Sequence, residues 1–258
     1  MKKFLAILLV LSLIAALASC AAKEPAVTPD NAEEPSDSEL GGDVGALAGG
    51  YFINDAAEPA ELPENVQNAF SLAMENYAGM SFTPVAYLAS QVVAGANYAV
   101  LCVGKPVVPD AVASLKVVVI YNGLDGNAEV LRVNDFNLTD YVSQSEDAPA
   151  QEPGLAGGWN ANTEFPEASL DEEAKKACAA VFNGNMGVDY QPIACLGTQV
   201  VAGLNYAFLC KATSSADEAN PVQLKVVTVY AALDGSYEVL STSALDLADI
   251  CGAQDVEE

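Results

Sequence analysis

The sequence contains an internal duplication, in which one unit occurs twice. Sliding the chain against itself by 108 positions aligns Leu47-Ala48-Gly49-Gly50 with Leu155-Ala156-Gly157-Gly158, and Gln91-Val92-Val93-Ala94-Gly95 with Gln199-Val200-Val201-Ala202-Gly203. After a one-residue insertion the agreement resumes, and Leu124-Asp125-Gly126 matches Leu233-Asp234-Gly235. A period of this length is too large for a solenoid repeat and is about the size of a small domain. The chain is therefore expected to hold two folded units of the same kind.

Composition separates these units from the rest of the chain. Residues 21–46 carry seven acidic side chains against Lys23, with three prolines and no aromatic residue. Such a stretch buries too little apolar surface to offset its ordering entropy, and a polar, proline-bearing stretch between the two copies indicates a linker. The expected organisation is an acidic disordered tether at 20–46, a first domain at 47–142, a linker at 143–154 and a second domain at 155–258.

Each copy contains the pattern of one amphipathic helix after its Leu-Ala-Gly-Gly segment. In the first copy the apolar residues at helical spacing follow Pro63 and precede Gly79, and in the second copy they follow a capping box of Ser169 and Glu172, before Gly184. The two apolar stripes are Val66, Ala69, Phe70, Ala73 and Tyr77, and Ala174, Ala177, Cys178, Val181 and Phe182.

Segments rich in Val, Tyr, Leu and Ile follow the helix pattern. In the first copy they are residues 82–93, 97–104, 113–121 and 128–133, and an Asp-Gly turn joins the last two, which is a strong hairpin signal. A helix followed by an antiparallel meander is expected to bury its apolar stripe against one face of the sheet. The expected fold class is therefore α+β, with one helix packed on an antiparallel sheet of four to five strands in each copy.

The first twenty residues have the pattern of an export signal. Lys2 and Lys3 precede an apolar run at 4–18 that is short for a membrane span. The run ends in Leu17-Ala18-Ser19-Cys20, which resembles the lipobox of bacterial lipoproteins. The resemblance implies a signal peptide at 1–19, a lipid on Cys20 and a cell-membrane anchor on the extracytoplasmic face. An ordinary signal peptide or an uncleaved anchor is the alternative, and either one also exports the chain.

The charged residues exclude several classes of function. The chain has 35 acidic and 10 basic residues, a formal charge of −25, one arginine and no histidine. Without histidine there is no Ser-His-Asp or Cys-His pair, and no metal site of the usual nitrogen-ligand kind. Binding to nucleic acid and to anionic lipid needs clustered Lys and Arg. We therefore expect a protein that is not an enzyme, holds no cofactor or metal and binds no nucleic acid.

The remaining cysteines indicate core positions rather than chemistry. Cys102, Cys178, Cys195, Cys210 and Cys251 are odd in number and contain no C-x-x-C pair. Several align with apolar residues of the other copy, as expected for small core side chains. A disulfide among Cys178, Cys195 and Cys210 stays open, since an oxidising exterior permits one.

The order of the motifs resembles the cystatin superfamily. In each copy a Leu-x-Gly-Gly segment, one helix and a Gln-Val-Val-Ala-Gly hairpin follow one another, and both copies continue with Asn and Tyr two and three residues after the glycine. The resemblance covers 47–142 and 155 to about 250 and implies two tandem cystatin-like domains. It also implies inhibition of papain-like cysteine proteases by a wedge of three segments that enters the active-site cleft.

The resemblance assigns the wedge residue by residue. The glycine pair and the two residues before it would enter the cleft without being cleaved, the hairpin loop would supply apolar area, and its Gln would brace the loop backbone. The protease-binding residues implied are Leu47, Ala48, Gly49, Gly50, Gln91, Val92, Val93, Ala94, Gly95 and Leu124 in the first copy, and Leu155, Ala156, Gly157, Gly158, Gln199, Val200, Val201, Ala202, Gly203 and Leu233 in the second.

The second hairpin departs from the family pattern. Cystatins often carry Pro-Trp in this loop, whereas here Leu124 and Leu233 are the apolar residues and each precedes an aspartate. Loss of an aromatic anchor costs on the order of 2 kcal/mol of binding energy, which implies weaker binding or a different range of targets. The expected protein is a monomeric, surface-anchored inhibitor with two heads. A non-inhibitory binding or adhesion lipoprotein on a cystatin-like scaffold is the alternative.

Overall fold

The computed structural model describes residues 50–54, 61–142, 157–164, 170–182, 187–217 and 221–252. The predicted signal peptide, Cys20, the tether and the linker lie outside the described residues, as do Leu47, Ala48, Gly49, Leu155 and Ala156. In the described part of the chain, no helix has the length and apolar character needed to cross a membrane.

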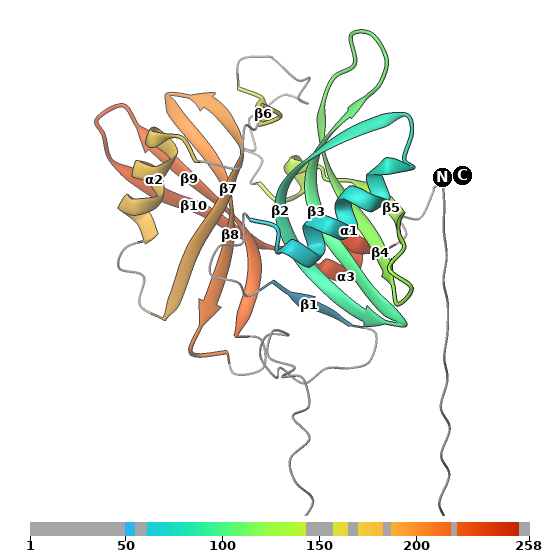
Figure 1. Ribbon diagram of the computed structural model, residues 1–258. Helices are drawn as coiled ribbons and strands as arrows, with labels where there is room; N and C mark the ends of the chain where they lie inside the picture. Colours follow the sequence, from blue (N-terminus) through green and yellow to red (C-terminus); the bar gives the residue numbers. More distant parts are fainter. Residues whose placement is uncertain are drawn as a thin grey trace, which may run out of the picture. The chain divides into compact units, whose positions relative to one another are not determined.

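The first copy forms one antiparallel sheet, here called sheet A, with its strands in chain order (Figure 1). The register places Tyr51 opposite Gln91, Asn97 opposite Tyr121, and Tyr121 opposite Glu129, so these residues, from all five strands, lie at one end of the sheet. The strands are β1 (Tyr51–Ile53), β2 (Met80–Val93), β3 (Gly95–Pro106), β4 (Ser114–Gly123) and β5 (Ala128–Asp135).

The second copy repeats this topology in sheet B, with the order β10-β9-β8-β7-β6. Trp159 lies opposite Gln199, as Tyr51 lies opposite Gln91, and β7 carries the same two register shifts as β2, one of them after Pro192. The strands are β6 (Trp159–Ala161), β7 (Val188–Val201), β8 (Gly203–Ser214), β9 (Val222–Ala232) and β10 (Tyr237–Ala244).

One helix covers the outer face of each sheet. α1 (Glu64–Glu75) begins after Pro63 and buries the predicted stripe except Tyr77, which lies beyond the end of the helix and contacts the ring of Phe82. α1 shares a buried cluster with Tyr98 and Val100 of β3. α2 (Glu172–Phe182) shares one with the residues at the same repeat positions of β8, Tyr206 and Phe208.

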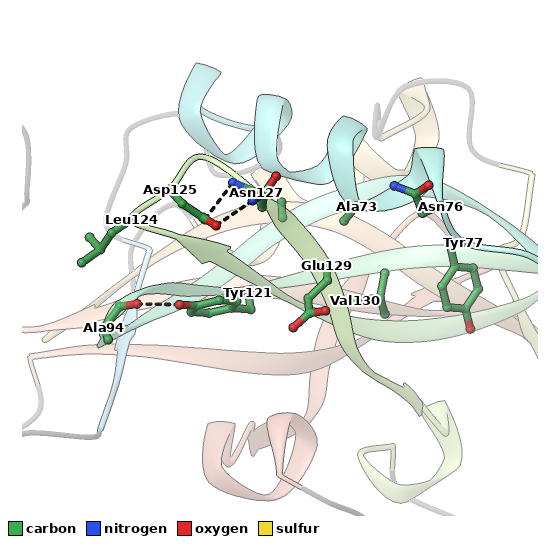
Figure 2. A pocket seen from close by; sticks show the side chains of 11 residues that line it. Ala73, Asn76, Tyr77, Ala94, Tyr121, Leu124, Asp125, Asn127, Glu129 and Val130 are labelled. Atoms are coloured by element: carbon green, nitrogen blue, oxygen red, sulfur yellow. Dashed lines mark hydrogen bonds between the residues drawn. The ribbon is translucent and has the colours of Figure 1, made fainter.

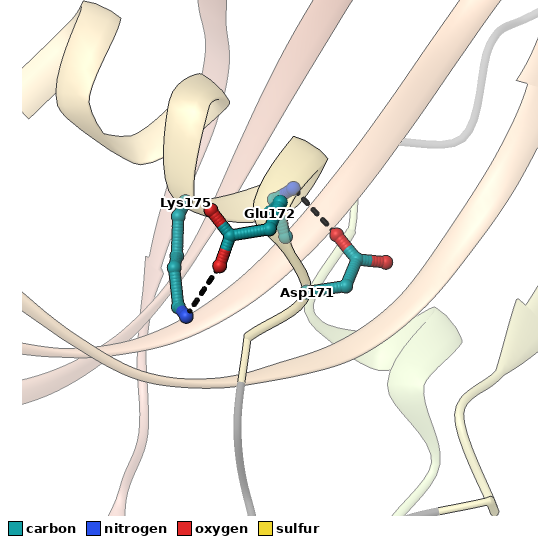
Figure 3. A network of polar contacts seen from close by, with 4 residues as sticks. Asp171, Glu172 and Lys175 are labelled. Atoms are coloured by element: carbon teal, nitrogen blue, oxygen red, sulfur yellow. Dashed lines mark hydrogen bonds and ion pairs between the residues drawn. The ribbon is translucent and has the colours of Figure 1, made fainter.

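The start of α2 differs from the predicted capping box. Asp171 accepts a hydrogen bond from the backbone N–H of Ala174 at 2.7 Å, while Glu172 binds Lys175 at 2.9 Å (Figure 3). Ser169 and Gly184 lie outside the described residues. The negative charge of an acidic side chain at this position also interacts favourably with the positive end of the helix dipole, which stabilises the start of the helix.

The two sheets share one core between their inner faces. In β3, Ala99 and Leu101 point into this core while Val100 and Cys102 point toward α1. The same buried cluster contains Ala207 and Leu209 of β8, so residues of both copies fill one apolar layer. Two additional short helices follow the last strands: η1 (Leu138–Asp140), and α3 (Leu247–Cys251), whose Ile250 belongs to the shared core.

The predicted α+β class, with two tandem cystatin-like domains that each pack a helix on a sheet, is wrong. The described residues are mostly β: two five-stranded antiparallel sheets against three short α-helices of 12, 11 and 5 residues. β2 and β7 each extend over 14 residues, and every central strand is buried on both faces. The prediction failed because it assigned only one buried face to each sheet and left the other to solvent.

Candidate functional site

The hairpin between β2 and β3 exposes apolar side chains at the end of sheet A. Val92 is 60% exposed and Val93 40% exposed, with Ala94 in the turn. Gly95 has φ +122°, and a Cβ at this position would collide with the carbonyl oxygen of Asn122. Only glycine fits there, because the backbone is left-handed and the neighbouring strand lies against it.

The hairpin between β7 and β8 repeats this geometry closely. Val200 is 58% exposed and Val201 40% exposed. Gly203 has φ +133°, and a Cβ there would collide with the carbonyl oxygen of Ala231. The two turns have nearly the same exposed valines and the same requirement for glycine, so both copies form the same kind of hairpin end.

The second hairpin of each copy lies beside the first. Gly95 pairs with Gly123 across β3 and β4, so the turn at 124–127 extends from the same end of sheet A, with Leu124 86% exposed. The hydroxyl of Tyr121 donates a hydrogen bond to the carbonyl oxygen of Ala94 at 2.7 Å (Figure 2). Tyr230 donates to Ala202 in the same way, at 2.5 Å, and Leu233 is also 86% exposed.

Gly50 and the Gly157-Gly158 pair also lie at these ends of the sheets. Gly50 directly precedes β1, which pairs with Gln91, and Gly157 and Gly158 directly precede β6, which pairs with Gln199. The amide nitrogen of Gln199 donates to the carbonyl oxygen of Gly157 at 2.7 Å, and its amide oxygen accepts from Asn205 at 2.8 Å. The side chain of Gln199 thus joins the glycine segment to the hairpin that follows it.

The structure therefore brings the described candidate residues together in two sets. Gly50, the 91–95 hairpin and Leu124 meet at one end of sheet A; Gly157, the 199–203 hairpin and Leu233 meet at one end of sheet B. Gly158 is buried, so its own atoms are not available for contact with a partner. We call these sets tip A (50, 90–98 and 120–130) and tip B (157–158, 198–206 and 229–239).

Sequence reasoning missed the tyrosines that fix these tips. Tyr121 and Tyr230 hold the turn carbonyls of Ala94 and Ala202. The signal was present, because each tyrosine lies three residues before the leucine of the repeated Leu-Asp-Gly turn. The spacing alone did not show that the hydroxyl reaches the neighbouring turn, because this contact depends on the pairing of β3 with β4 and of β8 with β9.

Each tip carries a fixed carboxylate beside its exposed leucine. Asp125 accepts hydrogen bonds from the backbone N–H of Asn127 at 3.1 Å and from its side-chain amide at 2.6 Å (Figure 2). Asp234 accepts from the N–H and the hydroxyl of Ser236, at 3.0 and 2.7 Å. These hydrogen bonds from Asn127 and Ser236 lower the pKa of both carboxyl groups, because they favour the charged form.

The two tips lie at opposite ends of the packed sheets. At the end of sheet A that carries tip A, Gly50 and Gln91 line a cavity together with Val222 and Ala244. Val222 begins β9 and Ala244 ends β10, which is the end of sheet B farthest from its tip. At the other end, Leu138 follows β5 and lies against Gly197, two residues from Gln199.

A groove runs beneath the second hairpin of the first copy. Ala73 and Tyr77 line it from the side of α1, and Tyr121, Leu124 and Glu129 line it from β4, the turn and β5 (Figure 2). The groove leaves one flank of tip A accessible, which gives Leu124 and Glu129 room to meet a partner surface.

The described cysteines are all buried and free. Cys178, Cys195 and Cys210 share the core beneath α2, and none of the disulfides that the sequence left open is formed among them. Burial raises the pKa of the Cys178 and Cys195 thiols to about 12. Within the described ranges, no group of three or more His, Cys, Asp or Glu side chains is placed to hold a metal ion.

Each tip thus exposes aliphatic side chains on constrained turns, backbone groups of the glycine segment, and one aspartate carboxylate fixed by hydrogen bonds within its turn. Comparison with known protein families and with curated protein sequences finds no match to this chain.

Proposed function

We propose that each tip inhibits a papain-like cysteine protease by occupying its active-site cleft. One observation carries the proposal: three segments far apart in the sequence, the glycine segment and two hairpin turns, meet at one end of a sheet, and the same three meet again in the other copy. A cleft is filled best by a narrow edge with apolar side chains, and Val92, Val93 and Leu124 supply one.

The rigidity of the tips supports tight binding. Gly95 sets the turn, Tyr121 ties its carbonyl to β4, and Gln199 ties the glycine segment in the other copy. Each constraint lowers the conformational entropy that binding would otherwise remove, so a small apolar interface loses less free energy on association. These constraints lie within the tips and are the same whatever the overall fold class.

The opposite placement of the tips supports a protein with two heads. Enzymes bound at tip A and tip B would approach from opposite ends of the sheets, so one complex need not block the other. The shared core joins both copies, so the independence of the two heads would come from the opposite placement of the tips and would not require a flexible linker at 143–154.

The export signal gives this proposal its location. We propose that Cys20 carries a lipid, that the signal peptide at 1–19 is removed and that the acidic tether at 20–46 holds the sheets on the extracytoplasmic side of the cell membrane. The protease would then be a secreted or surface enzyme. We expect a radiolabelled lipid precursor to be incorporated into the wild-type chain and not into the Cys20→Ala chain.

Titration of papain with the full-length chain in detergent tests the inhibitory role. The expected end point is two enzyme equivalents per chain, with each of Gly95→Glu and Gly203→Glu removing one. If micromolar protein leaves papain and the papain-like cathepsins fully active, the proposal is overturned.

A non-inhibitory binding role is the second candidate, and one observation favours it. The loop between β3 and β4 exposes Val107, Val108 and Val112 by 71, 61 and 84%, at the end of sheet A away from tip A. The corresponding loop of the second copy contains Ser215 and Asp217 and is polar. If the chain binds a cell surface through this loop, Val108→Ser should abolish the binding and Gly95→Glu should leave it unchanged.

A further inference from the structure

Both tips carry the same charge pattern. Tip A contains two acidic residues, Asp125 and Glu129, and no Lys or Arg. Tip B contains Asp234 and Glu238 and likewise no Lys or Arg. Because the two copies differ at many other positions, the agreement of four separate acids at matched places points to a shared role.

The four carboxylates flank the apolar surface rather than lying apart from it. Asp125 follows the exposed Leu124 directly, and Glu129 pairs across the strands with Tyr121, whose hydroxyl holds the turn of the neighbouring hairpin. Glu238 pairs with Tyr230 in the same way. All four carboxylate residues are exposed. Each tip is thus an aliphatic edge with a negative charge on its turn and another on its flank.

None of the ion pairs formed among the described residues involves a tip carboxylate, and Arg132, which lines the cavity bordered by Gly50 and Gln91, lies against the carbonyl oxygen of Cys251. Lys116 pairs with Asp135, Lys175 with Glu172, and Lys176 with Glu173, and none of these acids belongs to a tip. The chain as a whole carries a formal charge of −25, so the field at the tips is negative at short and long range. Hydrogen bonds from Asn127 and Ser236 within the turns lower the pKa of Asp125 and Asp234, because they favour the charged form of each carboxyl group.

We propose that the tips select papain-like proteases whose active-site cleft is bordered by Lys and Arg side chains. This rests on the proposed inhibitory function and adds the class of enzyme that the tips accept. The valines and leucines supply affinity inside the cleft, while the four carboxylates speed association with a basic rim and oppose an acidic one. The second hairpin, which lacks the aromatic residue of the family pattern, would then gain specificity from a carboxylate in place of part of the apolar contact.

Association kinetics at varied ionic strength test this selection. The full-length chain in detergent is mixed with one papain-like protease that has a basic cleft rim and one that has an acidic rim. For the basic enzyme the association rate constant is expected to fall about tenfold between about 0.05 M and about 0.5 M NaCl, because screening shortens the range of the attraction. For the acidic enzyme it is expected to rise with salt.

A charge-neutral variant assigns the effect to the tips. Asp125→Asn combined with Asp234→Asn keeps an acceptor for each turn and removes one charge per tip. It is expected to lower the association rate constant for the basic enzyme about threefold to tenfold at low salt, with little change in the dissociation rate. The matched control, Glu64→Gln with Glu173→Gln, removes the same charge from the first turns of α1 and α2 and should change the rate less than about twofold.

The outcomes separate the two proposals. If the chain inhibits both enzymes at rates that do not depend on salt, or if the tip variant behaves like the helix variant, inhibition stands and selection by charge is overturned. If the chain inhibits neither enzyme at any ionic strength, the inhibitory function itself is overturned, and selection by charge with it.

Discussion

Tyr121 and Ala94, which lie 27 residues apart in the sequence, join two hairpins: the tyrosine hydroxyl donates a 2.7 Å hydrogen bond to the alanine carbonyl oxygen. Tyr230 and Ala202 form the same bond at 2.5 Å. Each bond ties the turn of the first hairpin to the strand that leads into the second. The relative position of the two turns is therefore set within each tip, and both turns should respond when this bond is lost.

Replacing Tyr121 and Tyr230 by phenylalanine should loosen the tips without unfolding the sheets. The rings remain, and each tip loses one hydrogen bond worth about 1 kcal/mol, which corresponds to roughly a fivefold change in an equilibrium constant. Amide exchange at 93–95 and 201–203 should quicken by about that factor, and inhibition should weaken to a similar extent. Hydrogen exchange measured by mass spectrometry resolves both segments.

Tyr190→Phe is the control for this change, because its ring stacks on Phe182 at the other end of β7. It should leave exchange at both tips unaltered. Equal exchange rates in the Tyr121→Phe tip and the wild-type tip would show that the tyrosine bond does not hold the turn.

Gly95→Ala should disable one tip and leave the other intact. The residue has φ +122°, and its Cβ would collide with the Asn122 carbonyl, so the turn must change shape. Papain titration should fall from two enzyme equivalents to one, and to none when Gly203→Ala is added. Gly79→Ala is the matched control, since it has φ +94° but open space around its Cβ. A Gly95→Ala chain that still titrates two equivalents would place the inhibitory contacts elsewhere.

Local sequence signals predicted the order of elements well. The apolar spacing of Val66, Ala69, Phe70 and Ala73 matches the buried face of α1, and the Asp-Gly signals at 125 and 234 lie in hairpin turns. These signals depend on neighbours within one helix turn or one hairpin. They therefore report local structure, whatever the rest of the chain does.

The arrangement of the sheets was not predicted, and β3 shows why. Residues 98–103 of β3 are apolar without a break, and all six are buried. A strand with one solvent face should alternate, whereas a continuous apolar run indicates burial on both faces. The run was assigned to a sheet with one covered face because the pattern of each copy offers a single helix to cover it. The second face is buried in a cluster that includes residues of the other copy, such as Ala207 and Leu209, which no local pattern in β3 can reveal.

The shared core predicts that both copies unfold together. Leu138 of the first copy lies 2.5 Å from the position that a Cβ at Gly197 would occupy, and the Asn160 carbonyl lies 2.6 Å from it. Gly197→Val should therefore overpack the contact between the copies and lower the free energy of unfolding by about 1–3 kcal/mol. Fluorescence of Trp159 and far-ultraviolet circular dichroism should report one coincident urea transition in both chains.

Leu138→Ala in the Gly197→Val background separates the two causes of strain. It removes the side-chain clash while the backbone clash with Asn160 remains, so part of the lost stability should return. Two separate transitions in the wild-type chain, one for each copy, would contradict a common core.

The buried thiols predict a loss of stability at alkaline pH. Burial raises the pKa of Cys178, Cys195 and Cys251 to about 12, and raises that of Cys102 and Cys210 as well, because the apolar core disfavours the thiolate. In the unfolded chain a cysteine thiol has a pKa of about 8.5. Below that pH both states keep the thiol proton and the full stability is present. Above it the unfolded chain releases protons that the folded chain retains, so stability should fall steadily from about pH 8.5 toward about pH 12.

Urea unfolding at several pH values, with thiol counting, measures this linkage. The five described thiols should not react with a disulfide reagent in the folded chain and should all react in urea. Cys195→Ala should lower stability at neutral pH through lost packing, yet it should also flatten the alkaline slope, because one titrating thiol is gone. A slope that stays unchanged in this variant would contradict the assignment, since packing alone shifts the stability curve without changing its dependence on pH.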